Sequence, residues 1–145
     1  MLIDPEAELM RPRSIVAFER LLVVALALDL LINLASWSAF PAQLAAKGLP
    51  TSPVLILLLC LFSPALGAVF LYFVGRRGSN VARWILTVLV ALGVVGFVVI
   101  LAADFRAAAT PLFAATATSE VLKVIAVTRL FTAEAARWFE RSSGR

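Results

Sequence analysis

Two long apolar stretches, joined by a short basic turn, constrain this chain more than any other feature. Residues 54–74 carry no formal charge, and a second apolar stretch runs over residues 84–103. A helix rises about 1.5 Å per residue, so each stretch can cross the roughly 30 Å hydrocarbon core of a bilayer. Because lipid offers no hydrogen-bond partners, a crossing segment must satisfy its backbone internally, as a helix does. The pair predicts a transmembrane hairpin whose turn, residues 75–80, lies in water.

The composition agrees with a membrane protein and argues against several soluble classes. Apolar residues make up 62% of the 145 residues, above the share of about 45–50% in soluble domains. The single cysteine, Cys60, has no partner in the chain for a disulfide. The chain has no histidine, which is the commonest metal ligand and general base. The net charge of +4 lies at predicted helix ends, where membrane topology and anionic lipid explain it better than nucleic acid does.

Two further segments complete a predicted all-α bundle of four transmembrane helices. The first follows Arg11 and Arg13, as a signal peptide would, but it is long for one, it contains Asp29 and Asn33, and no suitable cleavage site follows it. The last is the least apolar, so it either spans the membrane or lies on its surface. Its polar residues fall mostly on one face, which favours spanning. We expect helices at about 15–37, 54–74, 82–103 and 111–131.

The remaining segments are assigned to water or to the membrane interface. Residues 1–14 are expected to form a soluble leader on the cytoplasmic side, and the Pro- and Gly-rich residues 38–53 to form a loop. Thr132 is a suitable N-cap for a short amphipathic helix within residues 132–145. Aromatic and basic side chains in this tail favour the membrane interface.

The distribution of Lys and Arg predicts the side that each loop faces. Ten of the 13 Lys and Arg residues lie in the leader and the start of the first helix, around the central turn, or from Arg129 onward. The two other loops hold only Lys47 and Arg106. Since positive residues are retained on the cytoplasmic side, we expect both termini and the central turn there. Anionic lipids at that face are the expected partners of these charges.

Ionisable residues within the predicted spans are the strongest candidates for a site. Asp29 and Asn33 share one face of the first helix, and Glu120 and Lys123 share a face of the last. Counted from the outer ends of these two antiparallel helices, Asp29 and Glu120 lie at matching depths. A charge at the bilayer centre costs roughly 2.5–3.5 kcal/mol even on a lenient scale, so these groups should face each other. The cluster is either an ion pair that fixes helix register or a proton or cation site.

Other features of the sequence are structural rather than catalytic. The chain contains no phosphate-binding loop, no metal-ligand spacing and no paired nucleophile and base, so we expect no enzyme, cofactor or metal. Gly93 and Gly96 predict a patch where another helix packs closely against residues 82–103. Pro64 is expected to kink the helix at residues 54–74, because it removes a backbone donor.

Three stretches at predicted membrane boundaries form a recognisable combination. They are Arg-Pro-Arg-Ser-Ile-Val-x-Phe-Glu at 11–19, Arg-Arg-Gly-Ser-Asn-Val-Ala-Arg-Trp-Ile-Leu at 76–86, and Leu-Phe-Thr-Ala-Glu-Ala-Ala-Arg-Trp-Phe at 130–139. Together they resemble a group of small uncharacterised bacterial inner-membrane proteins with four predicted helices. The resemblance implies a bacterial source and four helices rather than three, and it implies no activity. The small multidrug transporters also have four helices and a carboxylate on the first, but this chain lacks their surrounding pattern.

The sequence therefore predicts a four-helix inner-membrane bundle with both termini in the cytoplasm. The favoured function is non-enzymatic contact with lipids or with other membrane helices, from a second copy or another membrane protein. The alternative is a small dimeric carrier, coupled to protons or cations, that uses Asp29 and Glu120. A packed interior in which Asp29 bonds to Lys123 favours the first function. An open, wet cleft that reaches one surface favours the second.

Overall fold

The computed structural model describes residues 12–103 and 110–143, and all regular structure in these ranges is helical. Most of the predicted leader, residues 1–11, lies outside the described residues. So do residues 104–109, which include Arg106, residues 144–145, and the side chains of residues 141–143. The positions of the remaining Lys and Arg residues can be followed in the structure.

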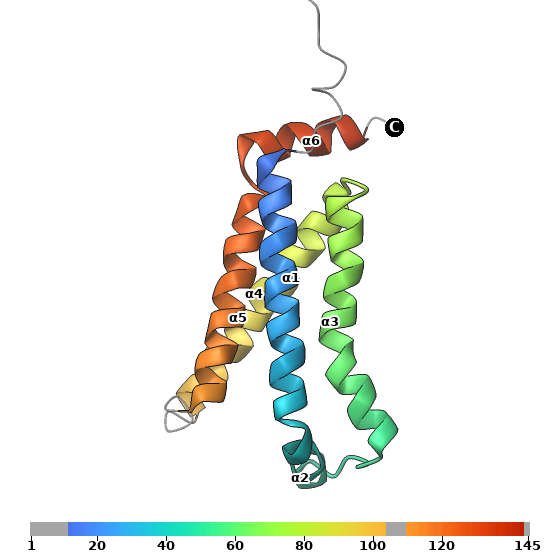
Figure 1. The fold of residues 1–145 in the computed structure, drawn as a ribbon, viewed down its shortest axis with the longest axis vertical. Coiled ribbons are helices and arrows are strands. Elements are labelled where there is room, and N and C mark those ends of the chain that lie inside the picture. Colours follow the sequence, from blue (N-terminus) through green and yellow to red (C-terminus); the bar gives the residue numbers. More distant parts are fainter. Residues whose placement is uncertain (1–11, 104–109, 144–145) are drawn as a thin grey trace, which may run out of the picture.

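Four long helices form the body of the molecule (Figure 1). They are α1 (Arg13–Ala35), α3 (Pro53–Gly75), α4 (Asn80–Ala103) and α5 (Pro111–Arg129). A 3-10 turn, η1 (Trp37–Ala39), and the short helix α2 (Phe40–Ala46) connect α1 to α3. The last helix, α6 (Ala133–Ser143), lies across the end of the bundle at which α1 begins (Figure 1).

Three of the described helices are long and apolar enough to cross a membrane, namely α3, α4 and α5. This set includes α5, for which the sequence left a surface position open. Helix α1 has 23 residues, as many as α3, but it contains Glu19, Arg20 and Asp29 and is not among the three. The structure thus supports a helical multi-pass membrane protein with three candidate spans.

Helix α1 lies between α5 and α3 and packs most extensively against α5. Its buried apolar residues, Ile15, Phe18, Leu22 and Ala25, recur every three or four positions and so form one stripe. Ile15, Phe18 and Leu22 contribute to a core with Val74 of α3 and residues from α4, α5 and α6, which sits toward the α6 end of the bundle. Because lipid chains are as apolar as leucine, this core is stabilised by close packing rather than by removal from water.

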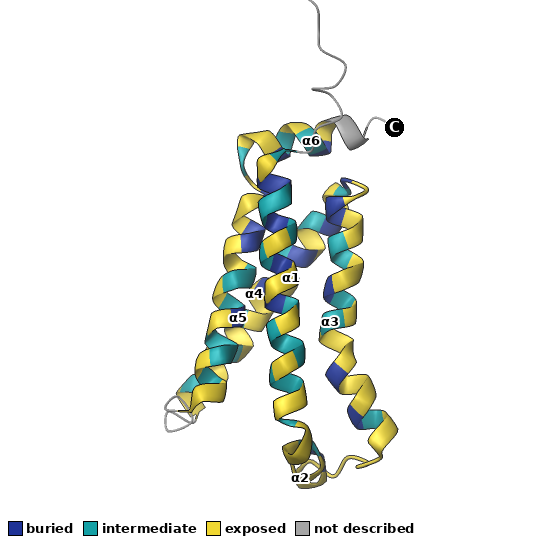
Figure 2. Cartoon of the chain, viewed as in Figure 1, coloured by how far each residue is buried: buried dark blue, intermediate teal, exposed yellow. Residues whose placement is uncertain are grey.

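The outward faces of α3 and α4 carry mostly apolar side chains, and most of both helices is exposed (Figure 2). Only 11% of the most apolar window of each helix is buried. Exposed side chains include Leu58 and Phe62 on α3, and Val98 and Ile100 on α4. Apolar surface this extensive is unfavourable in water, but it matches the hydrocarbon interior of a bilayer.

Hydroxyl side chains fix the starts of four helices. Ser52, Ser79, Thr110 and Thr132 each accept a hydrogen bond from the backbone N–H three residues along, at 3.2–3.4 Å. Each bond satisfies one of the N–H groups that a helix start leaves without a partner. Thr132 is the cap expected from the sequence, and the helix that it starts is α6.

The segment at residues 38–53 is more helical than the sequence suggested. It contains most of η1 and all of α2, where we expected a loop. Pro41 lies in the first turn of α2, where its missing N–H has no helical partner to lose. Leu44 is buried against Ile56 and Cys60 of α3, which holds α2 on the bundle. Proline here marks a helix start rather than a loop.

Helix α3 approaches α1 closely in its second half and leans away from α1 toward its N-terminal end (Figure 1). The helix continues through Pro64 without interruption. At Gly67 an added Cβ would overlap the end of the Leu26 side chain, so a larger residue there would require Leu26 to change its rotamer. At Gly75 an added Cβ would overlap the end of the Glu19 side chain in the same way.

Candidate intramembrane polar site

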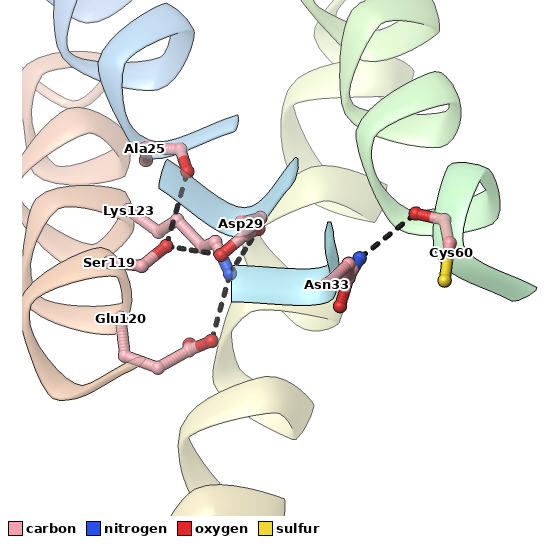
Figure 3. Close-up of polar contacts among 7 residues, drawn as sticks. All are labelled: Ala25, Asp29, Asn33, Cys60, Ser119, Glu120 and Lys123. Atoms are coloured by element: carbon pink, nitrogen blue, oxygen red, sulfur yellow. Dashed lines mark hydrogen bonds and ion pairs between the residues drawn. The ribbon is translucent and has the colours of Figure 1, made fainter. Parts of the chain in front are cut away.

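An ion-paired cluster joins α1 to α5 part-way along both helices (Figure 3). Lys123 Nζ lies 2.8 Å from Asp29 Oδ2 and 2.8 Å from Glu120 Oε1. The three side chains are only 12–15% exposed. Two carboxylates and one ammonium leave the cluster with a formal charge of −1. The structure therefore brings together three of the four residues that the sequence proposed as a polar site.

Ser119 completes the contact between the two helices. Its hydroxyl lies within hydrogen-bond distance of Asp29 Oδ1 and, at 3.3 Å, of the carbonyl oxygen of Ala25. A hydroxyl has one proton to donate, and the charged carboxylate is the stronger acceptor of the two. Ser119 is fully buried. Its small side chain allows α5 to come close to α1 at the level of Asp29.

The geometry of the cluster follows from two helical rules. Glu120 and Lys123 are three residues apart, so they lie one above the other on α5 and can pair. Helices α1 and α5 are antiparallel (Figure 1), which brings the second half of α1 level with the middle of α5. Asp29 then supplies the second carboxylate from the neighbouring helix.

Asn33 belongs to a different contact. Its Nδ2 donates to the backbone oxygen of Cys60 on α3, at 2.9 Å (Figure 3). Four positions along a helix rotate a side chain by about 40°, and α1 lies between α5 and α3. The two side chains are therefore offset around α1, and Asn33 contacts α3 while Asp29 contacts α5.

The carbonyl that Asn33 contacts is the one that Pro64 leaves without a helical partner. In a regular helix the N–H of residue 64 would donate to the carbonyl of residue 60, but proline has no N–H. Lipid offers no substitute donor. Asn33 supplies the missing donor from the adjacent helix. Asn33, the second of the polar residues proposed on α1, therefore has a structural role that Pro64 explains.

The two glycines predicted to form a packing patch differ in their surroundings. An added Cβ at Gly93 would lie 3.3 Å from Glu120 Oε2, so α4 passes close to the cluster there. At Gly96 an added Cβ would have no neighbouring heavy atom within 4 Å. The contact expected at Gly96 is thus not made among the described residues of one chain.

A cavity of about 260 Å³ lies beside the cluster, between α3 and α4. Of the neighbouring pairs of long helices, α3 and α4 contact each other least, which leaves this space. Its walls come from α1, α3, α4 and α5, and they are apolar except for Ser63, Glu120 and Lys123. The apolar lining includes Phe62, Leu66, Phe70, Leu86, Leu89 and Val90.

One carboxylate oxygen of the cluster has no hydrogen-bond donor among the described residues. Glu120 Oε2 is buried and has no hydrogen-bond partner among the described residues. Asp29 Oδ2 also lacks an aligned hydrogen bond, but it has the ammonium of Lys123 at 2.8 Å. A buried carboxylate oxygen without a donor is costly, so Glu120 Oε2 is the one incompletely satisfied acceptor of the site.

A second polar feature lies at the α6 end of the bundle. The guanidinium of Arg83 lies 5.8, 5.0 and 4.7 Å from the ring centroids of Trp84, Phe131 and Phe139. It also donates to the carbonyl oxygen of Leu130 at 3.5 Å. Cation–π contacts of this kind stabilise a partly buried arginine. They link α4 to the end of α5 and to α6.

The chain was compared with protein-family models, with curated proteins and with solved structures, and none of the three comparisons finds a match. Within residues 12–103 and 110–143, no three His, Cys, Asp or Glu side chains gather as a metal site. Function is therefore inferred from the geometry of the chain itself.

Proposed function

We propose that this protein is a small, non-enzymatic protein of a bacterial inner membrane that acts through contacts with lipids or with other membrane helices. The observation that carries the proposal is the pairing of Asp29 and Glu120 with Lys123, whose ammonium lies 2.8 Å from an oxygen of each. Such a cluster ties α1 to α5 and fixes their register. The apolar faces of α3 and α4 then form the surface available to lipid or to a partner helix.

We further propose that α1 is the fourth span. Its 23 residues are long enough to cross a bilayer, and it is packed between two candidate spans. Asp29, its one charge far from the helix start, is paired with Lys123, which it shares with Glu120. A charged residue distinguishes α1 from a typical span, and pairing of this kind reduces the free-energy cost of placing that charge in the bilayer.

Both termini are proposed to face the cytoplasm. The described arginines all lie toward the α6 end of the bundle, which also carries the turn between α3 and α4 (Figure 1). They are Arg13, Arg20, Arg76, Arg77, Arg83, Arg129 and Arg137. At the opposite end of the bundle, Lys47 is the only Lys or Arg among the described residues. An asymmetry of this size favours the arginine-rich end as the cytoplasmic one.

Anionic lipids are the proposed partners of this end. A groove of about 480 Å³ is lined by Arg13, Arg20 and Arg129 together with the apolar side chains of Val16 and Leu21. Guanidinium groups above an apolar floor, at the end of membrane-spanning helices, suit a lipid phosphate and its acyl chains.

The orientation is tested by labelling single cysteines with a membrane-impermeant thiol reagent in intact spheroplasts. Cys60 is first replaced by Ala, so that no other thiol reacts. A cysteine in place of Gln43 should react, and one in place of Ser79 should be protected until the cells are permeabilised. The reverse pattern would overturn the orientation.

The function is tested by measuring flux and particle mass on one preparation. Under an imposed pH gradient, vesicles that contain the parent protein should pass no more protons than vesicles that contain Asp29→Asn. In mild detergent the particle should retain a second copy or tightly bound anionic lipid. Proton flux that Asp29→Asn abolishes would favour a carrier instead, and a lipid-free single chain would contradict a contact function.

A proton- or cation-coupled carrier is the second candidate, and the cavity beside Glu120 is the observation that favours it. Transport requires a site that opens to each side in turn. The flux measurement on Asp29→Asn, repeated on Glu120→Gln, decides between the two functions.

A further inference from the structure

We propose that the cavity between α3 and α4 binds a hydrophobic molecule that carries a single ammonium group, and that Glu120 recognises that group. This site goes beyond the contact function above, because it gives the protein a small-molecule ligand. The proposal rests on the apolar lining of the cavity, on the charge of the cluster at its wall, and on the one unsatisfied carboxylate oxygen.

The charge of the cluster selects the head group of the ligand. Lys123 is already shared between Asp29 and Glu120, so it has little attraction left for an anion. The cluster retains a charge of −1, and Glu120 Oε2 has no donor. An ammonium group would donate to that oxygen and bring the site to zero charge, which favours it strongly in a low-dielectric interior. A neutral apolar occupant would leave the oxygen unsatisfied.

The walls of the cavity select the rest of the ligand. Aromatic and leucine side chains of α3 and α4 line it, and its volume of about 260 Å³ suits an alkyl chain or a single ring system rather than a hydrated ion. Since α3 and α4 face lipid, a hydrophobic ligand can enter sideways from the bilayer. Glu120 lines the cavity, and its Oε2 lies against α4 at Gly93. A rotation about the side-chain bonds of Glu120 would turn this buried oxygen toward a ligand in the cavity.

The head group is tested with three probes of equal chain length on the parent protein in nanodiscs of zwitterionic lipid. Octylammonium, octanol and octanoate are titrated, and the midpoint of thermal unfolding is followed. A ligand that binds the folded state raises this midpoint saturably. Octylammonium should do so at the lowest concentration. If all three probes act alike, the cavity only takes acyl chains, and if octanoate acts best, Lys123 is the recognising group. Either result overturns the proposal.

Variants test the position of the site. Glu120→Gln should weaken octylammonium binding by about tenfold or more, as loss of a charge-assisted hydrogen bond does, and should leave the effect of octanol unchanged. Gly93→Val fills the space beside Glu120, whereas Gly96→Val makes the same substitution on the same helix where nothing lies within 4 Å. Binding lost only in Gly93→Val supports the site. Octylammonium binding that survives both Glu120→Gln and Gly93→Val rules out the site. The comparison of the three probes uses the parent protein, so it remains valid even if a variant fails to fold.

Discussion

Asn33 and Pro64 should be energetically coupled, because one residue supplies the hydrogen bond that the other removes. Replacing Asn33 by Leu keeps the size of the side chain but deletes its donor. The carbonyl of Cys60, which Asn33 contacts at 2.9 Å, is then left without a donor in the bilayer. Hydrogen bonds between membrane helices contribute about 0.6 kcal/mol on average and up to about 1.7 kcal/mol. We expect a loss of about 1–2 kcal/mol in the free energy of unfolding, toward the upper end of that range, since the orphaned carbonyl has no alternative within its helix.

The same substitution should cost much less in a Pro64→Ala background. Alanine restores the N–H that donates to the carbonyl of residue 60 within α3. Asn33 then competes with a regular helical hydrogen bond, and its removal leaves no unsatisfied group. The double-mutant cycle should give a coupling energy of about 1 kcal/mol between the two sites.

The measurement is the free energy of unfolding of four proteins: the parent, Asn33→Leu, Pro64→Ala and the double variant. Reversible titration with a denaturing detergent, followed by circular dichroism, provides it. Thr118→Val is a suitable control, because its hydroxyl donates to the carbonyl of Ala114 within its own helix and should show no coupling to Pro64. Equal costs of Asn33→Leu in the two backgrounds would refute the role assigned to this asparagine.

Three further predictions concern other contacts of the bundle. Lys123→Met leaves two buried carboxylates without their cation and should lower the free energy of unfolding by about 3–5 kcal/mol. Unfolding titrations should show part of this loss restored at lower pH, because a neutral carboxyl is cheaper to bury, and part of it restored at neutral pH by adding Asp29→Asn. Gly67→Leu should cost about 1–3 kcal/mol by overpacking α3 against α1, whereas Gly96→Leu should be close to neutral, and similar losses in both would show that the close approach is misplaced. Arg83→Gln should increase amide hydrogen exchange in α6 and leave exchange in α1 unchanged, and an unaltered α6 would contradict the anchoring contact.

The meeting of Asp29 with Lys123 could be predicted from the sequence because physics leaves few alternatives. Ionised side chains cannot face lipid, and matching depth on antiparallel helices left α1 and α5 as natural partners. Asn33 could not be assigned in the same way. Its side chain is uncharged, so the cost of facing lipid does not assign it to one neighbouring helix, and its offset of about 40° from Asp29 leaves both α5 and α3 open. The carbonyl exposed by Pro64 was a signal in the sequence that would have indicated its partner.

Small residues carried less information than charges. Gly67, Gly93 and Gly96 all permit close approach, but only the packing of the neighbouring helix decides where that freedom is used. Gly67 meets α1, Gly93 passes Glu120, and Gly96 faces no described helix. The cavity was likewise invisible in the sequence, because it results from the sparse contact between α3 and α4 rather than from any motif.

The polar atoms inside this bundle connect its stability to its proposed ligand. Lipid provides no donors or acceptors, so each intramembrane polar group needs a partner from the protein or from something bound to it. Asp29 is satisfied by Ser119 and Lys123, and Asn33 is used at the carbonyl exposed by Pro64. These contacts explain why α1 and α5 tolerate polar residues between apolar neighbours, and they need no ligand. Glu120 is different, because one of its oxygens is paired and the other is buried beside an apolar cavity with no donor. Because lipid cannot satisfy this second oxygen, it is where a bound ammonium group has the most to contribute.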